Sequence, residues 1–543
     1  IGECLRPSPL PLHPQGVRRW VPRCCAATLP QLGLLLLCAA WLLPGLVGHA
    51  PWKGGDGDHF VQLWLLLQSD VAPQAAAATP PLYYWVAAAT AWLTSPILAL
   101  PDGARLASGV FIALALFFVA RTARALYGAE AGWAAALTLL GCVGLLVRGH
   151  ELNAYTAQFA AAAIMLHGVA GLPQNPRSGW ALGIGATLML LAGGAAEALL
   201  ILALAGVLPL LLEEYRSPAA RRALLWGVGL ALAASAAWLA YLATQAIPFV
   251  RVLNLQRWLG GDGLRPAYYP GILAWYAWPA WPLAAWALYR GRRQWRTPGM
   301  VLPLGALVGL LGLYALAAHP GEEQGLILLL PLALLGAAGL FSLRRGAASA
   351  LLWFALMLFG FIGLLLWAYW SAHDLGRPAR LAARLVKLGM TGVGELRPWA
   401  LAIGLVVTLI WVGFLARVDR SPLRPILVWT ASLTFIWVLL MALFQAPLDR
   451  RLSYVSVGEA LAARVPPAAC IQTHQVRSTQ RLLLAYHSGR QLVPVDAGCD
   501  WQLLETRRNE AEPHVPDDWI KQWEGARPGD RSDRFHLYAR RRQ

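Results

Sequence analysis

Acidic, basic and imidazole side chains gather in one short stretch near the start of the chain. Residues 48–60 read GHAPWKGGDGDHF and contain Lys53, Asp56, Asp58 and His59. A carboxylate in such a loop can orient or deprotonate an attacking group, and Asp and His are also ligand types for divalent metals. Because Asp is common in glycine-rich turns, turn formation alone is the alternative explanation for both aspartates.

Further candidates lie in three later segments. His150 and Glu151 are adjacent, and capping of a helix end at the membrane boundary explains them as well as a role in a site. His319, Glu322 and Glu323 form an outer-loop cluster, which a solvated loop explains more readily than a role in the site does. Three arginines share one segment: Arg251, Arg257 and Arg265. The planar guanidinium group donates two parallel hydrogen bonds to phosphate, so these arginines favour a phosphate-bearing ligand or, equally, phospholipid headgroups.

The composition identifies the kind of protein that holds these residues. The chain has 543 residues, of which 58% are hydrophobic and 13% charged, and its mean hydropathy is +0.51. Soluble domains carry about 25% charged residues, and here apolar stretches of about 18 residues or more recur along most of the chain. The net charge of +17 comes from arginine clusters between these stretches, which is typical of topology signals and not of a nucleic-acid-binding face. We therefore exclude a soluble enzyme and predict an all-α polytopic membrane protein.

Hydropathy predicts about thirteen transmembrane helices. They are 31–48, 104–123, 131–147, 154–172, 180–193, 195–212, 224–247, 268–289, 299–318, 325–342, 349–371, 399–416 and 426–444. With the N-terminal arginines in the cytoplasm, the later arginine clusters fall on the same side. This agreement requires that segment 81–100 lies at the membrane surface instead of crossing, and that Gly193 and Gly194 break 180–212 into two spans.

The same topology predicts which segments lie on the outer face of the membrane. Segments 49–103, 148–153, 248–267 and 319–324 share that face, so a site built from them opens outward. Segment 372–398 is predicted to be a basic amphipathic helix on the outer surface, where it contacts membrane lipids.

The domain organisation follows from these spans. We predict a cytoplasmic segment 1–28, a transmembrane domain 29–445 with a first outer loop 49–103, and an outer C-terminal domain 446–543. The polar composition of 446–543 predicts a small α/β domain with strands at 482–486 and 492–495. If this domain is extracytoplasmic, Cys470 and Cys499 can form a disulfide.

Several of these motifs together resemble a known group. The Trp-Lys and acidic residues of the first loop, PPLYYW at 80–85, the run at 104–128 and the His-Glu pair at 150–151 are similar to the ArnT-like aminoarabinose transferases and protein O-mannosyltransferases. These are membrane glycosyltransferases of the GT-C superfamily, glycosyltransferase family 39 type, and thirteen spans with a C-terminal periplasmic domain match their architecture.

The resemblance implies a function and a location. It implies transfer of a sugar from a polyprenyl-phosphate donor, such as an undecaprenyl one, to a lipid A-like or other acceptor on the periplasmic face of a bacterial inner membrane. Modification of the lipopolysaccharide of the cell envelope follows from the same likeness. The partners are the lipid-linked donor, a lipid or glycolipid acceptor and membrane lipids, with no nucleic acid.

The resemblance also implies roles for residues. Asp56 and Asp58 are the catalytic candidates. The substrate-binding candidates are Lys53, His59, Tyr83, Tyr84, His150, Glu151, Arg251, Arg257 and Arg265. No cofactor is required by the sequence, and a divalent metal on Asp56 is left open.

The sequence departs from the family pattern at three positions. Gly55 stands where the family has the aspartate of an Asp-Glu pair, Thr79 where it often has lysine, and Tyr155 where it has aspartate. Two alternatives to an active transferase therefore stay open. One is a catalytically degenerate scaffold that binds lipid-linked sugars, and the other is a transporter of such lipids.

Overall fold

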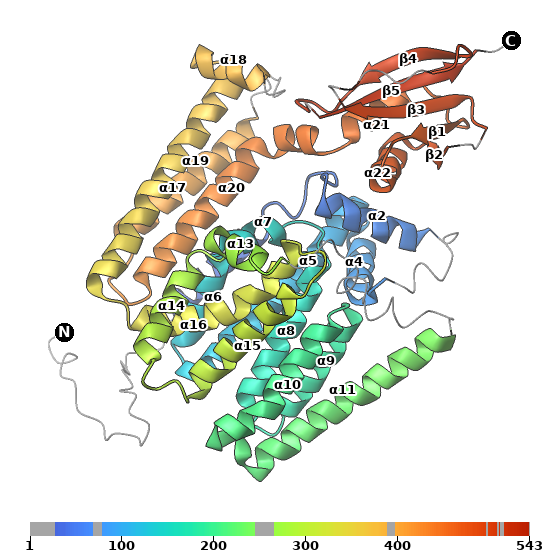
Figure 1. Cartoon of the computed structure of the whole chain (residues 1–543). Coiled ribbons are helices and arrows are strands. Elements are labelled where there is room, and N and C mark those ends of the chain that lie inside the picture. Colours follow the sequence, from blue (N-terminus) through green and yellow to red (C-terminus); the bar gives the residue numbers. More distant parts are fainter. Residues whose placement is uncertain are drawn as a thin grey trace.

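The structure is a computed structural model of the chain, and it describes residues 28–68, 79–244, 265–387, 397–495, 498–507, 510, 515–530 and 532–541. A large bundle of helices carries a small β-sheet domain at one end (Figure 1). The predicted arginines Arg251 and Arg257 lie outside the described residues.

The bundle contains long and short helices. They are α1 (Thr28–Leu42), α2 (Gly55–Leu67), α4 (Pro81–Thr94), α5 (Leu100–Tyr127), α6 (Ala131–Leu140), α7 (Val143–Gly149), α8 (Tyr155–Gly171), α9 (Ser178–Leu191), α10 (Ala195–Leu211), α11 (Pro218–Thr244), α13 (Tyr268–Tyr276), α14 (Ala280–Gly291), α15 (Pro298–Ala315), α16 (Leu329–Phe341), α17 (Arg345–Asp374), α18 (Ala379–Lys387), α19 (Pro398–Arg417) and α20 (Arg424–Leu452). In the described part of the chain they are joined by the 3₁₀ helices η1 (Glu213–Arg216) and η3 (Glu323–Leu328).

Each predicted span coincides with one helix or with two consecutive helices. The span 131–147 is broken into α6 and α7, which meet at 66°, and 268–289 is broken into α13 and α14. Among the described residues, seven helices are long and apolar enough to cross a membrane, or eight with the bent pair. The structure therefore establishes a multi-pass helical membrane protein, and the full count of thirteen crossings stays a prediction.

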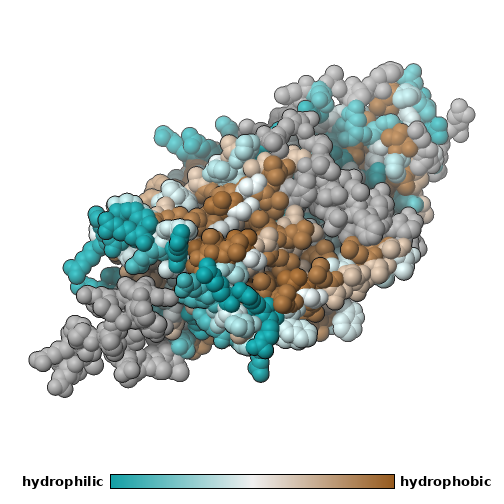
Figure 2. All heavy atoms as spheres, turned by 60° about the horizontal axis from the view of Figure 1, so that its bottom comes forward, coloured by the Kyte–Doolittle hydropathy of each residue, from teal (hydrophilic) through white to brown (hydrophobic). Residues whose placement is uncertain are grey.

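The outer surface of the bundle is apolar. Large hydrophobic side chains such as Trp226, Met357 and Leu409 are at least 70% exposed, on α11, α17 and α19. Figure 2 shows hydrophobic residues over the middle of one face of the molecule and hydrophilic residues gathered toward its ends. Such an apolar surface is stable only against lipid, because a water-soluble monomer rarely exposes a patch of that size.

Two predicted local features can be compared with the helices. Gly193, with φ of 80°, lies in the break between α9 and α10, where the sequence predicts one. The segment 81–100 forms α4, a helix of 14 residues, followed by a turn. At 1.5 Å per residue, α4 is about 21 Å long, which is less than the roughly 30 Å of a hydrocarbon core.

The C-terminal part forms a mixed sheet with helices. Its elements are α21 (Val455–Ala462), β1 (Cys470–His474), α22 (Ser478–Ser488), β2 (Gln491–Pro494), β3 (Trp501–Arg507), β4 (Trp519–Gly525) and β5 (Asp533–Arg540), with strand order β2-β1-β3-β5-β4. β1 pairs in parallel with β2 and β3, and β5 pairs antiparallel with β3 and β4. The α/β character and the strand at 492–495 agree with the sequence, but the strand predicted at 482–486 is wrong, because this segment lies inside α22. The predicted boundary at 446 falls inside α20.

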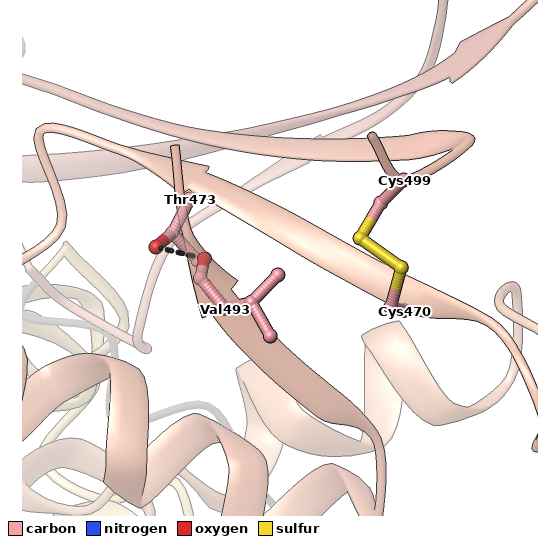
Figure 3. The surroundings of a disulfide bond; sticks show 4 residues. All are labelled: Cys470, Thr473, Val493 and Cys499. Carbon is pink, nitrogen blue, oxygen red and sulfur yellow. Dashed lines mark hydrogen bonds between the residues drawn. A yellow bond between two sulfur atoms is a disulfide. The ribbon is translucent and has the colours of Figure 1, made fainter. Parts of the chain in front are cut away.

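The two cysteines that the sequence singles out are joined in a disulfide. Cys470 at the start of β1 is bonded to Cys499 just ahead of β3, with 5.5 Å between their Cα atoms (Figure 3). Nearby, the Thr473 hydroxyl donates to the Val493 carbonyl at 2.9 Å and links β1 to the edge strand β2.

The first loop is attached to the C-terminal end of α20, from which the sheet domain continues. Trp52 and Ser453 form an isolated antiparallel bridge, and the Lys53 amide donates to the Leu452 carbonyl at 2.9 Å. The Asp449 carboxylate accepts hydrogen bonds from the Ala50 amide and the Trp52 indole, both at 3.0 Å. The first loop is therefore fixed to the end of α20, and the hydrogen bond from Thr479 of α22 to Asp58 links it to the C-terminal domain.

Candidate active site

Asp56 lies at the centre of a buried polar network under the first loop. Nε and one terminal nitrogen of Arg105 each donate to a different oxygen of the Asp56 carboxylate at 3.2 Å. The Trp52 amide donates to the same carboxylate at 2.8 Å, and the Leu152 amide at 2.7 Å. Asp56 is 1% exposed. These bonds tie the first loop, α5 and the segment after α7 together at one carboxylate.

Electrostatics keep the Asp56 carboxylate ionised in this buried place. Burial by itself raises the pKa of Asp56, but the charge of Arg105 and the hydrogen bonds outweigh it and hold the pKa below its ordinary value. A carboxylate with four donors and no solvent access is suited to positioning the loop, since no room is left for a substrate oxygen.

A second, more open cluster surrounds Arg148 at the end of α7. One terminal nitrogen of Arg148 lies 3.1 Å from Glu151 and 4.0 Å from Glu323, and the other lies 2.6 Å from Glu322. All four side chains are between one fifth and just over one third exposed. The cluster joins two loops, 148–153 and 319–324, that the sequence places on one face.

His59 connects the first loop to this cluster. Its Nδ1 lies 2.9 Å from the Tyr84 hydroxyl, and its Nε2 lies 3.5 Å from Glu323. Two of the predicted substrate-binding residues, His59 and Tyr84, thus meet a carboxylate from a distant segment. Tyr155, from the start of α8, lies with its ring edge-on to His59.

Tyr83 is hydrogen-bonded to the backbone and side chains that hold Glu151 in place. Its hydroxyl lies 2.9 Å from the Ser108 hydroxyl and accepts a hydrogen bond from the Asn153 amide at 3.0 Å. Ser108 donates to the Glu151 carbonyl at 2.7 Å. The predicted residue Tyr83 is therefore buried scaffolding that fixes the backbone on which Glu151 stands.

Glu151 and His150 are neighbours with different surroundings. Burial raises the pKa of Glu151 to about 7, and Arg148 opposes this only in part. The His150 ring is buried, with its two nitrogens 2.9 and 2.8 Å from the carbonyl oxygens of Leu146 and Trp41. Burial lowers the pKa of His150 to about 4, so this histidine is neutral and structural at neutral pH.

Lys53 and Asp58 face away from the cluster. Both line a cleft of about 1050 Å³ between the first loop and the sheet domain, opposite Arg477 and Glu505. Asp58 is exposed and accepts a hydrogen bond from the Thr479 hydroxyl at 2.7 Å. The three charged candidates of the first loop therefore lie in different surroundings. Asp56 is buried, whereas Lys53 and Asp58 border this cleft.

The last two predictions to compare with the structure are Arg265 and a metal ion on Asp56. Arg265 is exposed three residues before α13. In the part of the chain that the structure describes, no group of three His, Cys, Asp or Glu side chains is arranged to hold a metal ion. The oxygens of Asp56, the metal ligand that the sequence leaves open, already accept four hydrogen bonds.

Sequence reasoning did not single out Arg105 or Arg148. It explained Glu322 and Glu323 as residues of a solvated loop. An arginine inside an apolar helix needs a buried partner, and that signal could have identified Arg105. The predicted topology already placed 148–153 and 319–324 on one face, which is the signal for Arg148 and its carboxylates.

Comparisons with known proteins address the fold. No protein-family model matches the sequence, and no curated protein matches it. The crystal structure of ArnT from Cupriavidus metallidurans bound to undecaprenyl phosphate is similar with a TM-score of 0.64 and 16% identity, over 95% of this chain and 98% of that one. This chain has the ArnT fold.

The likeness to ArnT does not depend on one structure. ArnT from the same organism in the apo state is similar with a TM-score of 0.61 and 15% identity, over 94% of this chain and 98% of that chain. The similarity therefore includes both the bundle and the C-terminal sheet domain.

Proposed function

We propose that the protein is a membrane glycosyltransferase that moves a sugar from a polyprenyl-phosphate donor to an acceptor. The observation that carries this proposal is the Arg148 cluster. Three partly exposed carboxylates, a guanidinium group and His59 converge from the first loop, the end of α7 and η3 in a chain with the ArnT fold. ArnT has been seen with undecaprenyl phosphate bound, which supports a donor of the same class.

The cluster has the groups that this reaction needs. Positive charge develops on the sugar as the bond to the phosphate breaks, and carboxylates close to the anomeric carbon stabilise it. The departing phosphate needs cations, for which we propose Arg251, Arg257 and Arg265. Lys53 and Asp58 then serve the acceptor through the cleft beside the sheet domain.

The location is part of the same proposal. Thirteen crossings would place both the cluster and the C-terminal domain on the periplasmic side of a bacterial inner membrane. The Cys470–Cys499 disulfide supports this side, because disulfides persist in oxidising compartments. A lipid or glycolipid is the acceptor that a site at this membrane face would meet.

The proposal is tested with the purified protein in liposomes. A panel of polyprenyl-phosphate sugars is supplied, and the released polyprenyl phosphate and the glycosylated lipid are measured together. We expect release with at least one donor, and a loss of about 100-fold or more in Arg148→Gln. Arg345→Gln, an exposed arginine on α17, is the matched control and should retain activity.

The glycine at position 55 favours a second candidate function, that of a scaffold that binds lipid-linked sugars without turnover. The chain has no side chain at the position where the resembling family has its aspartate. In the same assay, donor binding with no release from any donor would favour the scaffold.

A further inference from the structure

A carboxylate from another part of the chain occupies the space beside Gly55. Gly55 is the first residue of α2, and a Cβ added to it would overlap Oε1 of Glu323. The next nearest carboxylate group is that of Glu151, whose Oε2 lies 3.9 Å from the same point. Glu323, from η3, therefore places its carboxyl group where a side chain of residue 55 would begin.

We propose that Glu323 is the general base of the site and accepts the proton of an acceptor hydroxyl, doing from η3 what a carboxylate at position 55 could do from α2. This inference rests on the proposed glycosyltransferase function. It assigns the acceptor group as a hydroxyl, because a phosphate acceptor is already anionic at neutral pH and needs no base.

The surroundings of Glu323 suit this role. The side chain is 20% exposed, so a substrate oxygen can reach it, whereas Asp56 is sealed. Oε2 lies 3.5 Å from Nε2 of His59, and Nδ1 of that ring lies 2.9 Å from the Tyr84 hydroxyl. With the tyrosine donating to Nδ1, the Nε2–H of His59 points to Glu323 and orients it. Oε1, the oxygen beside Gly55, is 4.0 Å from Arg148.

The other carboxylates are less suitable. Glu322 forms the shortest pair with Arg148, at 2.6 Å, and serves to hold that guanidinium group. Glu151 forms a second pair with Arg148 at 3.1 Å, and its nearer oxygen is 3.9 Å from the Cβ position of residue 55, well behind the oxygen of Glu323. Glu323 lies farthest of the three from Arg148 and nearest to the first loop.

The step is a single displacement. The acceptor oxygen forms a bond to the anomeric carbon while its proton passes to Glu323, and the carbon–oxygen bond to the phosphate breaks. That electron pair leaves with the polyprenyl phosphate, so no oxidant, reductant or further reactant is required. The anomeric configuration is inverted.

The first test removes the carboxylate with the smallest change in shape. Glu323→Gln should lower kcat for sugar transfer by about 100-fold or more, the usual scale of a lost general base. The acidic limb of its pH–rate profile should also disappear, which a merely structural role would not cause. Glu459→Gln, an exposed glutamate on α21, should behave like wild type.

The second test moves the carboxylate back to α2. In the double variant Glu323→Ala, Gly55→Asp, the aspartate side chain can enter the space that the truncation opens. Its activity should exceed that of Glu323→Ala alone by about tenfold or more, whereas Glu323→Ala, Gly55→Asn should show no gain. Size-exclusion profiles and melting temperatures identify any variant that fails to fold. A gain of activity in the double variant is by itself evidence that this variant folds.

The outcomes separate the two proposals. If wild-type protein releases no polyprenyl phosphate from any donor, the glycosyltransferase function fails first. If wild type is active and Glu323→Gln is as active as Glu459→Gln, the function stands and the assignment of Glu323 is overturned. Transfer to a phosphate instead of a hydroxyl would also overturn it.

Discussion

Asp56 and Arg105 form an ion pair that solvent does not reach, with both carboxylate oxygens 3.2 Å from guanidinium nitrogens. Asp102 also contacts this guanidinium, at 3.1 Å. The pair joins the first loop to α5, and the Leu152 amide adds the segment that leads from Arg148 to α8. The geometry of the candidate site thus depends on a buried carboxylate that already accepts four hydrogen bonds.

Loss of this charge should destabilise the protein before it changes the chemistry. Asp56→Asn leaves the buried Arg105 with one acidic partner, and breaking such a pair costs about 3 kcal/mol or more. Thermal unfolding of the purified variant should show this as a clearly lower Tm. Asp58→Asn, whose amide oxygen can still accept the exposed hydrogen bond from Thr479, should stay within about 1 kcal/mol of wild type. A fully stable but inactive Asp56→Asn would instead make Asp56 a participant in the reaction.

Glu151 should make stability depend on pH around neutrality. The pKa of Glu151 is about 7 in the folded protein, against an ordinary value of 4.5 that applies to the unfolded chain. Between these two pH values the folded state binds a proton at Glu151 that the unfolded state has lost. This contribution to stability is complete below about pH 4.5 and is lost as pH rises to 7.

The variant Glu151→Gln isolates that contribution. The difference in Tm between Glu151→Gln and wild type should grow in favour of the variant from pH 5 to pH 8. Glu459→Gln should follow the wild-type pH dependence. A difference that stays constant over this range would show that Glu151 titrates normally.

The disulfide should stabilise the sheet domain. Cys470 and Cys499 are separated by 29 positions, and closing a loop of that size stabilises a fold by about 3 kcal/mol. Replacing both cysteines by serine should lower the unfolding transition of the C-terminal domain and leave the helical signal of the bundle in place. Peptide mass spectrometry without reduction should recover the linked pair from wild type, and two free thiols at these positions would contradict the structure.

The proposed topology makes a labelling prediction. In a variant whose only free thiol is introduced by Glu459→Cys, an impermeant maleimide should label intact spheroplasts. With Glu213→Cys, in η1, labelling should require lysis, because the predicted topology puts η1 in the cytoplasm and the sheet domain outside. Equal labelling of both positions in intact cells would mean that the order of crossings is wrong.

The sequence predicts the helices well because most spans are long and uniformly apolar. It fails at 482–486, where three leucines in a row fit a buried strand as well as the helix α22. The break between α6 and α7, which meet at 66°, contains the single glycine Gly141 and no proline, so the sequence marks it only weakly.

The site is less accessible to sequence reasoning. His59 and Tyr84 could be singled out because they lie in the first outer loop, but Glu323 becomes their neighbour only when η3 folds across the end of α7. The burial of Asp56 is likewise invisible in a glycine-rich loop, because it depends on Arg105 from another helix.

The central claim is that this chain turns over a lipid-linked sugar, and a count of turnovers tests it most directly. Wild-type protein in liposomes would be incubated with an excess of each polyprenyl-phosphate sugar, and polyprenyl phosphate and glycosylated acceptor would be quantified against the amount of protein. We predict that one donor yields many molecules of both products per protein molecule, in equal amounts. Saturable binding of donor with neither product formed would contradict the claim and identify a scaffold.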